Sequence, residues 1–207
     1  SFLSIPLIGS IAAGEAIEAI NSSDSVLEKF GNRKDLWIPV CVALFLGLLF
    51  IAWQPLPIDP SYESYHRLAK NWLAGYGFTV TPSPLNNPDI FRTPGYPLLL
   101  IFFYWLIGPS PIPVYVFQVV LHALTPALIF ALVRRAFPRR VALFSSWLIA
   151  LYPLTVLYVP TILPEPVSLF VTVLSVWLFL RVLDRPSVFR SVLLGVVFAY
   201  GTLLRPS

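Results

Sequence analysis

The sequence predicts an all-α fold, a polytopic transmembrane bundle of about four or five spans with juxtamembrane helices in its first outer loop. Hydrophobic residues make up 57% of the chain and charged residues 12%, whereas about a quarter of the residues in a soluble domain are charged. Four stretches contain no Asp, Glu, Lys or Arg: Leu36–Ile58, Thr93–Val133, Val141–Pro164 and Pro166–Leu180. The first three reach the length of about 20 residues that a helix needs to cross the hydrocarbon core. The fourth does so if Glu165 and Arg181 lie at the two interfaces.

Residues 36–207 are expected to form the transmembrane domain, and residues 1–35 a cytoplasmic N-terminal segment. The first span is predicted at about Leu36–Pro55. The sequence QPLPIDP ends this helix, because proline has no amide hydrogen and its ring clashes with the preceding turn.

A short amphipathic helix is expected next, at about Pro60–Ala74. Its apolar residues, among them Tyr65, Leu68 and Trp72, recur at the three-and-four spacing of one helix face. An apolar stripe with Tyr and Trp is typical of a helix that lies at the membrane interface. Gly75 is well placed to cap its C-terminus.

The rest of the chain alternates short and long apolar segments. Tyr96–Ile107 is too short to span and is expected to be a half-inserted or juxtamembrane helix, ended by the sequence GPSPIP. Further spans are predicted at about Val114–Val133, Val141–Tyr158 and Pro166–Leu183. A fifth begins near Arg190 and is cut off at Ser207, so the domain is expected to be truncated at its C-terminus.

Basic residues indicate which connections face the cytoplasm. They gather in three places: Lys29, Arg33 and Lys34; Arg134, Arg135, Arg139 and Arg140; and Arg181, Arg185 and Arg190. The positive-inside rule places all three on the cytoplasmic side of what is expected to be a bacterial or archaeal membrane. The loop from Ile58 to Thr93 and the connection that holds Glu165 then face outward.

Several classes of function are not expected. The basic residues are not gathered on one soluble face, which argues against nucleic acid as a partner. Cys41 is the single cysteine, so the chain has no disulfide framework or thiolate metal cluster. The sequence contains no Walker loop, dinucleotide fingerprint or HExxH motif, and soluble nucleotide cofactors therefore have no visible cradle.

Asp59, at the outer mouth of the first span, is the first candidate for chemistry. A carboxylate there can meet both a membrane-bound and a polar substrate, and it can act as general base towards an acceptor hydroxyl. Asp59 is equally well placed as the N-cap of the next helix, with Pro60 at the first helical position, and the two roles are compatible. Glu63, one turn later, is either an alternative base or a solvated helix charge.

Three cations of the same outer loop, Arg67, Lys70 and Arg92, can stabilise a phosphate leaving group. Arg92 is the best placed, because the Pro-Gly-Tyr-Pro turn that follows anchors it where an apolar helix begins. Arg67 and Lys70 can instead extend to phospholipid headgroups. His66 is a candidate proton relay for which the sequence shows no partner. His122 can hydrogen-bond between helices from within the second span.

Two further charges are expected in the outer half of the membrane. Glu165 lies at or just inside the outer boundary, where a carboxylate is costly and marks either a functional site or the interface itself. Arg205 lies roughly 22 Å along a helix that starts near Arg190. A buried cation at that depth needs an anionic partner, such as Glu165, Asp59 or a substrate phosphate.

Several segments, taken in order, resemble one family of membrane enzymes. They are Asp59 followed by SYESYHRLAKNWLAGYGF, then FRTPGYPLLLIFFYWLIG, YPLTVLYVPTILPEPVSLF and GTLLRP. Over roughly residues 37–207 the chain resembles the GT-C superfamily of polyprenyl-phosphate-sugar-dependent membrane glycosyltransferases, particularly the protein O-mannosyltransferase and aminoarabinose-transferase group. This resemblance implies a polyprenyl-phosphate-linked sugar donor and a reaction in the cell envelope.

The resemblance also implies roles for individual residues. The catalytic Asp of the family's first outer loop corresponds to Asp59, the basic residue that holds the lipid phosphate to Arg92, and the acid of the second outer loop to Glu165. Members often carry a second acid beside the first, whereas Pro60 follows Asp59 here, and Glu63 is therefore an alternative for the base.

These observations predict an inverting glycosyltransferase that moves a sugar from a polyprenyl-phosphate donor to an acceptor hydroxyl on the outer face of the membrane. Asp59 would deprotonate the hydroxyl. Arg92, helped by Arg67 or Lys70, would stabilise the departing phosphate, and Arg205 is a further candidate to bind it. The sequence leaves the sugar and the acceptor open.

One alternative is a transporter or flippase for a lipid-linked or small anionic substrate, supported by Arg205 and the broken helices. A non-catalytic scaffold is a third reading, but it leaves the grouping of Asp59 and Arg92 unexplained. The sequence identifies no cofactor with certainty, and a divalent metal ion is possible. Asp59, Glu63 and Glu165 can offer oxygen ligands to a divalent metal ion, although their spacing does not demand one.

Overall fold

A computed structural model describes residues 34–53, 64–81 and 88–204 of the 207-residue chain, and every regular element in these ranges is an α-helix. In chain order the helices are α2 (Lys34–Trp53), α3 (Ser64–Leu73), α4 (Gly95–Ile107), α5 (Ile112–Val133), α6 (Arg139–Ala150), α7 (Pro153–Tyr158), α8 (Glu165–Asp184) and α9 (Val188–Leu204). Helices α2, α5 and α8 are long and apolar enough to cross a membrane. The predicted fold class, a helical membrane bundle, is confirmed.

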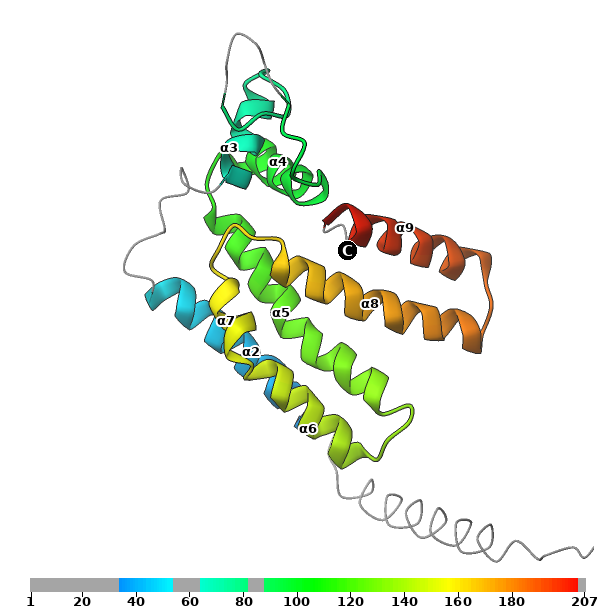
Figure 1. Cartoon of the computed structure of the whole chain (residues 1–207). Coiled ribbons are helices and arrows are strands. Elements are labelled where there is room, and N and C mark those ends of the chain that lie inside the picture. Colours follow the sequence, from blue (N-terminus) through cyan, green and yellow to red (C-terminus); the bar gives the residue numbers. More distant parts are fainter. Residues whose placement is uncertain (1–33, 54–63, 82–87, 205–207) are drawn as a thin grey trace, which may run out of the picture.

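Helix α5 is the central element of the bundle. It packs against α2 and α6 on one side and against α8 on the other, and α8 forms a hairpin with α9 (Figure 1). Large apolar side chains cover the outside of these helices, among them Phe45, Phe144 and Phe198. Such exposure is expected where a helix faces lipid, because its apolar side chains then contact lipid rather than water. The backbone polar groups are satisfied within each helix.

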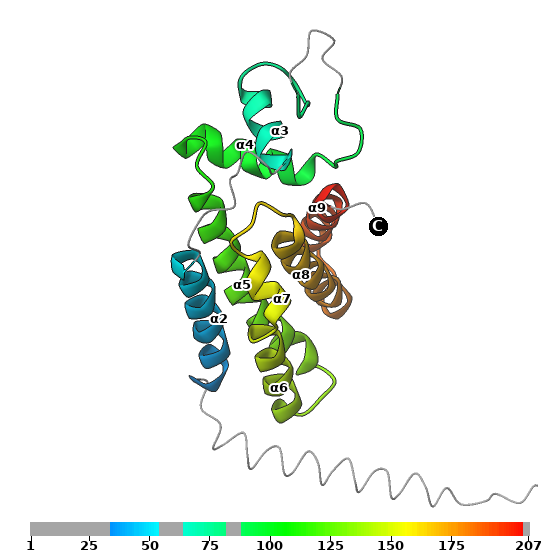
Figure 2. The same cartoon turned by 60° about the vertical axis from the view of Figure 1, so that its left-hand side comes forward.

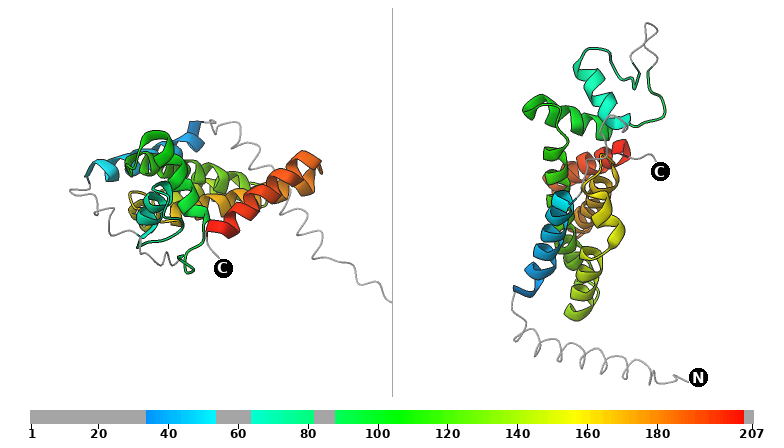
Figure 3. Two further views of the ribbon diagram at one scale, coloured as in Figure 1. Left: turned by 90° about the horizontal axis from the view of Figure 1, so that it is seen from above. Right: turned by 90° about the vertical axis from the view of Figure 1, so that its left-hand side faces the viewer.

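Helices α3 and α4 form a separate layer at one end of the bundle. They pack against each other, and α4 runs across the end of α5 rather than alongside it (Figures 2 and 3). With 13 residues, α4 is too short to span a membrane, which agrees with the predicted juxtamembrane helix.

The α5–α6 connection, the end of α8 and the start of α2 lie together at the opposite end of the bundle. Arg135, after α5, pairs with Asp184 at the end of α8 at 2.5 Å between Nη2 and Oδ1. Arg139, at the start of α6, pairs with Asp35 at the start of α2 at 3.1 Å between Nη2 and Oδ2. These pairs join the α5–α6 connection to the end of α8 and to the start of α2.

The predicted third span, Val141–Tyr158, is wrong as a single helix. Helix α6 ends at Ala150, and the separate helix α7 begins at Pro153. Proline has no amide hydrogen, and its ring pushes the preceding residue out of the helical region. Tyr152 is accordingly extended, with φ −65° and ψ 114°.

The other boundaries differ from the predictions by a few residues. Helix α2 begins at Lys34, inside the predicted N-terminal segment, and α9 begins at Val188 rather than Arg190. Residues 1–33 and the first residues of the helix predicted at Pro60–Ala74 lie outside the described ranges.

Candidate active site

The C-terminus of α3 is closed by the predicted glycine cap. Gly75 has φ +85°, a conformation that glycine adopts without steric cost. The N–H of Tyr76 donates to the Asn71 carbonyl at 2.9 Å, and the N–H of Gly75 donates to the Trp72 carbonyl at 3.0 Å. This is the hydrogen-bond pattern of a Schellman cap.

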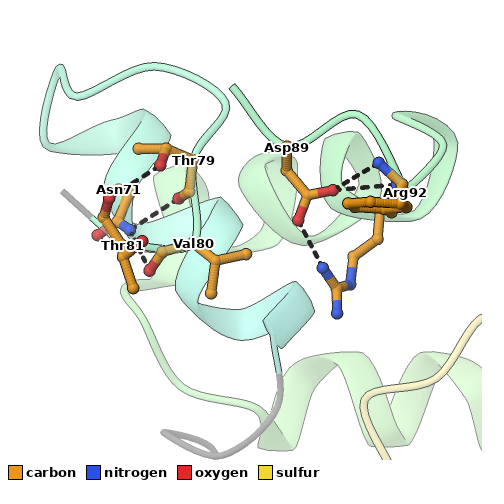
Figure 4. A network of polar contacts seen from close by, with 7 residues as sticks. Asn71, Thr79, Val80, Thr81, Asp89 and Arg92 are labelled. Atoms are coloured by element: carbon orange, nitrogen blue, oxygen red, sulfur yellow. Dashed lines mark hydrogen bonds and ion pairs between the residues drawn. The ribbon is translucent and has the colours of Figure 1, made fainter. Parts of the chain in front are cut away.

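The Asn71 side chain ties the same helix to the loop after it. Its Nδ2 donates to the carbonyls of Thr79 at 2.8 Å and Val80 at 3.0 Å (Figure 4). The Thr79 hydroxyl in turn donates to the Thr81 carbonyl at 3.0 Å. The segment that follows α3 is therefore held against this helix.

Arg92 is fixed by an acid that the sequence analysis did not select, Asp89. One carboxylate oxygen of Asp89 accepts the backbone N–H groups of Phe91 and Arg92, at 2.9 and 3.1 Å, and the other pairs with Nη1 of Arg92 (Figure 4). The Arg92 guanidinium also lies 5.7 Å from the centre of the Tyr65 ring, within range of a cation–π contact. The Asp89 side chain is 7% exposed and that of Arg92 is 31% exposed. The guanidinium of Arg92 is therefore bound by a buried carboxylate and is itself partly accessible from outside the protein.

The turn after Arg92 packs closely against the end of α9. A Cβ on Gly95 would lie 2.5 Å from the carbonyl carbon and oxygen of Leu203, so only glycine fits there. The Thr93 hydroxyl donates to the Leu204 carbonyl at 3.0 Å, and the Tyr200 hydroxyl donates to the Gly95 carbonyl at 3.4 Å. Contacts with α9 therefore hold the turn that the sequence suggested as the anchor of Arg92.

A chain of buried contacts leads from Arg92 to the connection between α7 and α8. The Tyr65 ring packs edge-on against Tyr96, with centroids 5.3 Å apart. The Tyr96 hydroxyl donates to Oε1 of Gln118 at 2.8 Å. Nε2 of Gln118 donates to the carbonyls of Val159 at 2.7 Å and Thr161 at 2.8 Å. A buried amide therefore joins α4 to the connection between α7 and α8.

Glu165 begins α8 directly after that connection. Its Oε2 is buried and accepts no hydrogen bond from the described residues. A carboxylate in the first turn of a helix is favoured by the helix dipole. The unpaired oxygen nevertheless has a hydrogen-bonding capacity that a ligand hydroxyl could use, because a buried acceptor without a partner is costly.

The structure places some of the predicted site residues and not others. Arg92 and Glu165 lie at the same end of the bundle, the end that carries α3 and α4 (Figure 1). Arg67 and Lys70 are exposed on α3. Asp59, Glu63 and Arg205 lie outside the described residues. The convergence of Asp59 with Arg92 therefore stays a prediction.

The interpretation of His66 as a residue without a partner is wrong. His66 is buried, and its Nδ1 lies 2.7 Å from the Tyr104 hydroxyl on α4. The sequence alone does not reveal this pair, because the two residues lie on different helices that only the packing of α3 on α4 brings together. His122 is also buried, but its Nε2 makes no hydrogen bond within the described ranges.

The described residues were also considered as ligands of a metal ion, because the sequence offers three carboxylates for one. Among residues 34–53, 64–81 and 88–204, no group of three or more His, Cys, Asp and Glu residues could hold a metal ion. Of the three carboxylates suggested as ligands, only Glu165 is described; Asp59 and Glu63 are not.

Comparison with protein families now decides the class of this protein. The model of the dolichyl-phosphate-mannose-protein mannosyltransferase family matches residues 88–207, which is more than half of the chain. The chain belongs to this family. No curated protein and no solved structure matches it.

Membership in the mannosyltransferase family confirms the resemblance noted in the sequence. It makes the protein an integral membrane glycosyltransferase that uses a lipid-linked sugar donor. The matched region contains Asp89, Arg92, Gln118 and Glu165, whereas α3 and Asp59 precede it.

Proposed function

We propose that this protein transfers a sugar from a polyprenyl-phosphate donor to an acceptor hydroxyl at the membrane surface where α3 and α4 lie. We take this surface to be the outer one, because the basic connections gather at the opposite end of the bundle. The observation that carries the proposal is the position of Arg92. It is a partly exposed cation, held by Asp89 and Tyr65, at the start of a helix that lies across the end of a membrane bundle.

Arg92 supplies the charge that the leaving group requires. The donor phosphate gains negative charge as its bond to the sugar breaks, and a guanidinium can donate two parallel hydrogen bonds to it. The ion pair with Asp89 uses Nη1, which leaves other N–H donors of the guanidinium for the phosphate. Arg67 and Lys70 on α3 add positive charge, and Arg205 follows Leu204, whose carbonyl is bound by Thr93.

Asp59 is the proposed general base. It takes the proton of the acceptor hydroxyl while the acceptor oxygen forms a bond to the anomeric carbon. The bond between that carbon and the phosphate oxygen breaks, and its electron pair leaves with the polyprenyl phosphate. Attack opposite the leaving group inverts the anomeric configuration. Glu63 is the alternative base.

Glu165 is proposed to orient a substrate hydroxyl. Its buried, unpaired Oε2 can accept a hydrogen bond, and the connection before it is held by Gln118. The same amide holds Tyr96, which packs on Tyr65 beneath Arg92. The phosphate-binding and hydroxyl-binding groups are therefore fixed by one set of contacts.

The alternative function, a transporter or flippase, has no specific contact in its favour among the described residues, and Arg205, which suggested it, lies outside them. A divalent ion held by Asp59, Glu63 and Glu165 stays a prediction from the sequence. Loss of transfer on addition of EDTA, and its return with Mg²⁺ or Mn²⁺, would support that ion.

The test uses membranes that contain the full-length protein, supplied with radiolabelled polyprenyl-phosphate mannose. Transfer is measured as label that moves from the lipid extract to the acceptor fraction. Asp59→Asn should abolish transfer at unchanged expression, because the amide cannot take a proton. Asp35→Asn is the matched control at the other end of the bundle and should transfer normally. Full transfer by Asp59→Asn would remove Asp59 from the reaction.

A further inference from the structure

The end of the hairpin between α8 and α9 contains a basic cavity far from the candidate active site. The cavity has a volume of about 390 Å³ and is lined by Arg181, Asp184, Arg185 and Arg190. Asp184 is bound by Arg135, a residue that does not line the cavity, so its charge is already compensated. The cavity therefore has an excess of positive charge.

Two of its arginines are held in place by contacts of their own. The Arg181 guanidinium lies 4.8 Å from the centre of the Trp177 ring. Nη1 of Arg190 donates to the Arg185 carbonyl at 2.6 Å. Because these side chains are already ordered, an anion that binds them does not bear the full entropic cost of fixing them.

Apolar surface surrounds this cavity. Leu183, Val188 and Phe189 are large apolar residues exposed at the same end of the hairpin. A second, apolar groove of about 410 Å³ lies between α8 and α9, with Phe179, Ser191, Gly195 and Phe198 in its lining. Leu194, which also lines the groove, lies one helical turn after Arg190 on the same face of α9, so the groove adjoins the basic cavity along that helix.

We propose that this end of the α8–α9 hairpin binds an anionic phospholipid. The phosphate lies among Arg181, Arg185 and Arg190, and an acyl chain lies in the groove beside Gly195. Arginine suits a phosphate because its planar guanidinium donates paired hydrogen bonds. Basic cavities between membrane helices at a charged membrane surface are suited to anionic headgroups. A soluble phosphate compound would occupy the cavity but not the apolar groove.

The first experiment titrates the full-length protein, purified in detergent, with phosphatidylglycerol and counts bound lipid by native mass spectrometry. Arg181→Gln combined with Arg185→Gln should weaken binding about thirtyfold, since each arginine near a lipid surface contributes about 1 kcal/mol and every 1.4 kcal/mol or so is a factor of ten. Arg134→Gln combined with Arg140→Gln removes the same charge from the same end, outside the cavity, and should change binding less than about twofold. Equal losses in the two double variants, or equal binding of phosphatidylcholine by the unaltered protein, would overturn the proposal.

A second experiment distinguishes a lipid from a soluble phosphate compound. A Cβ on Gly195 meets nothing within 4 Å, so Gly195→Leu can fill the groove without displacing the helices. This variant should weaken phosphatidylglycerol binding severalfold and leave the binding of soluble glycerol phosphate unchanged. The proposal fails if glycerol phosphate displaces the lipid at equal concentration, or if Gly195→Leu binds the lipid normally. Either result would mean that the acyl chain does not contribute to binding.

Discussion

Both ends of the bundle carry Arg–Asp pairs, but the pairs are built differently. At the basic end, the pairs Arg135–Asp184 and Arg139–Asp35 join different helices. The two arginine side chains are 33% and 19% exposed, and their Asp partners are 46% and 42% exposed. At the α3–α4 end, Asp89 and Arg92 are three residues apart, and the Asp89 side chain is only 7% exposed.

Exposed ion pairs contribute about 0–1 kcal/mol, because water and salt screen them. The pairs of the basic end therefore contribute little to the stability of the fold. Asp89 instead accepts two backbone N–H groups as well as the guanidinium, and Tyr65 contacts the same guanidinium. This difference indicates that the α3–α4 end is built to hold one cation in a fixed place.

The largest expected effect is on Arg92. Arg92→Gln should lower transfer about a hundred- to a thousandfold, the usual cost of removing a group that stabilises developing negative charge. Arg140→Gln, an exposed arginine of the basic end, should transfer normally. Radiolabel transfer by both variants at matched expression is the measurement. Equal activity of the two would remove the functional difference between the ends.

The next largest effect is expected from Gln118→Leu. The leucine removes the hydrogen bond with the Tyr96 hydroxyl and those to the carbonyls of Val159 and Thr161, and each buried carbonyl left unsatisfied costs about 1–3 kcal/mol. Thermal unfolding in detergent should show a clear drop in midpoint. Tyr96→Phe removes one of these bonds and should lower the midpoint by less; the reverse order would contradict the role of Gln118 as the shared partner.

Gly95→Ala should also destabilise the α3–α4 end. The added Cβ would lie 2.5 Å from the Leu203 backbone, which cannot move as a side-chain tip can. We expect a cost of about 1–3 kcal/mol, as for other overpacked sites. Gly195→Ala meets nothing within 4 Å and should keep or raise the unfolding midpoint, because alanine favours a helix over glycine by about 1 kcal/mol. A stable Gly95→Ala variant would show that α4 and α9 are not in close contact.

The smallest effect is expected at the basic end. Asp184→Asn should change the unfolding midpoint only slightly, and the change should shrink as salt is added, because water and ions screen an exposed pair. Measurement of the midpoint at low and high ionic strength checks this. A large drop in midpoint that salt does not reduce would mean that the exposed Arg135–Asp184 pair stabilises the fold as a buried pair does, and the contrast between the two ends would then fail.

Much of the fold followed from the sequence, because lipid imposes strong rules on it. Runs without charge gave the long helices α2, α5 and α8, and the clusters of basic residues gave the end at which three connections meet. Gly75 marked the end of α3. The break at Pro153 was overlooked because the run was judged by its length and lack of charge, although a proline inside it predicts a break.

The candidate site was only partly predictable. Arg92 stood out because few cations border an apolar helix, but Asp89, three residues earlier, was not recognised as its partner. Gln118 could have been noticed, since an amide inside an apolar run needs hydrogen-bond partners within the protein. Its partners could not have been named, because Val159 and Thr161 come near it only when α5 packs on α8.

The most direct test of the account is the binding of undecaprenyl phosphate and undecaprenol to the full-length protein, to Arg92→Gln and to Arg140→Gln. The unaltered protein and Arg140→Gln should prefer the phosphate. Arg92→Gln should lose at least about tenfold of this preference, since a hydrogen bond to a charged group contributes about 1.5–3 kcal/mol. If folded Arg92→Gln keeps the full preference, the lipid phosphate binds elsewhere and the proposed site is wrong.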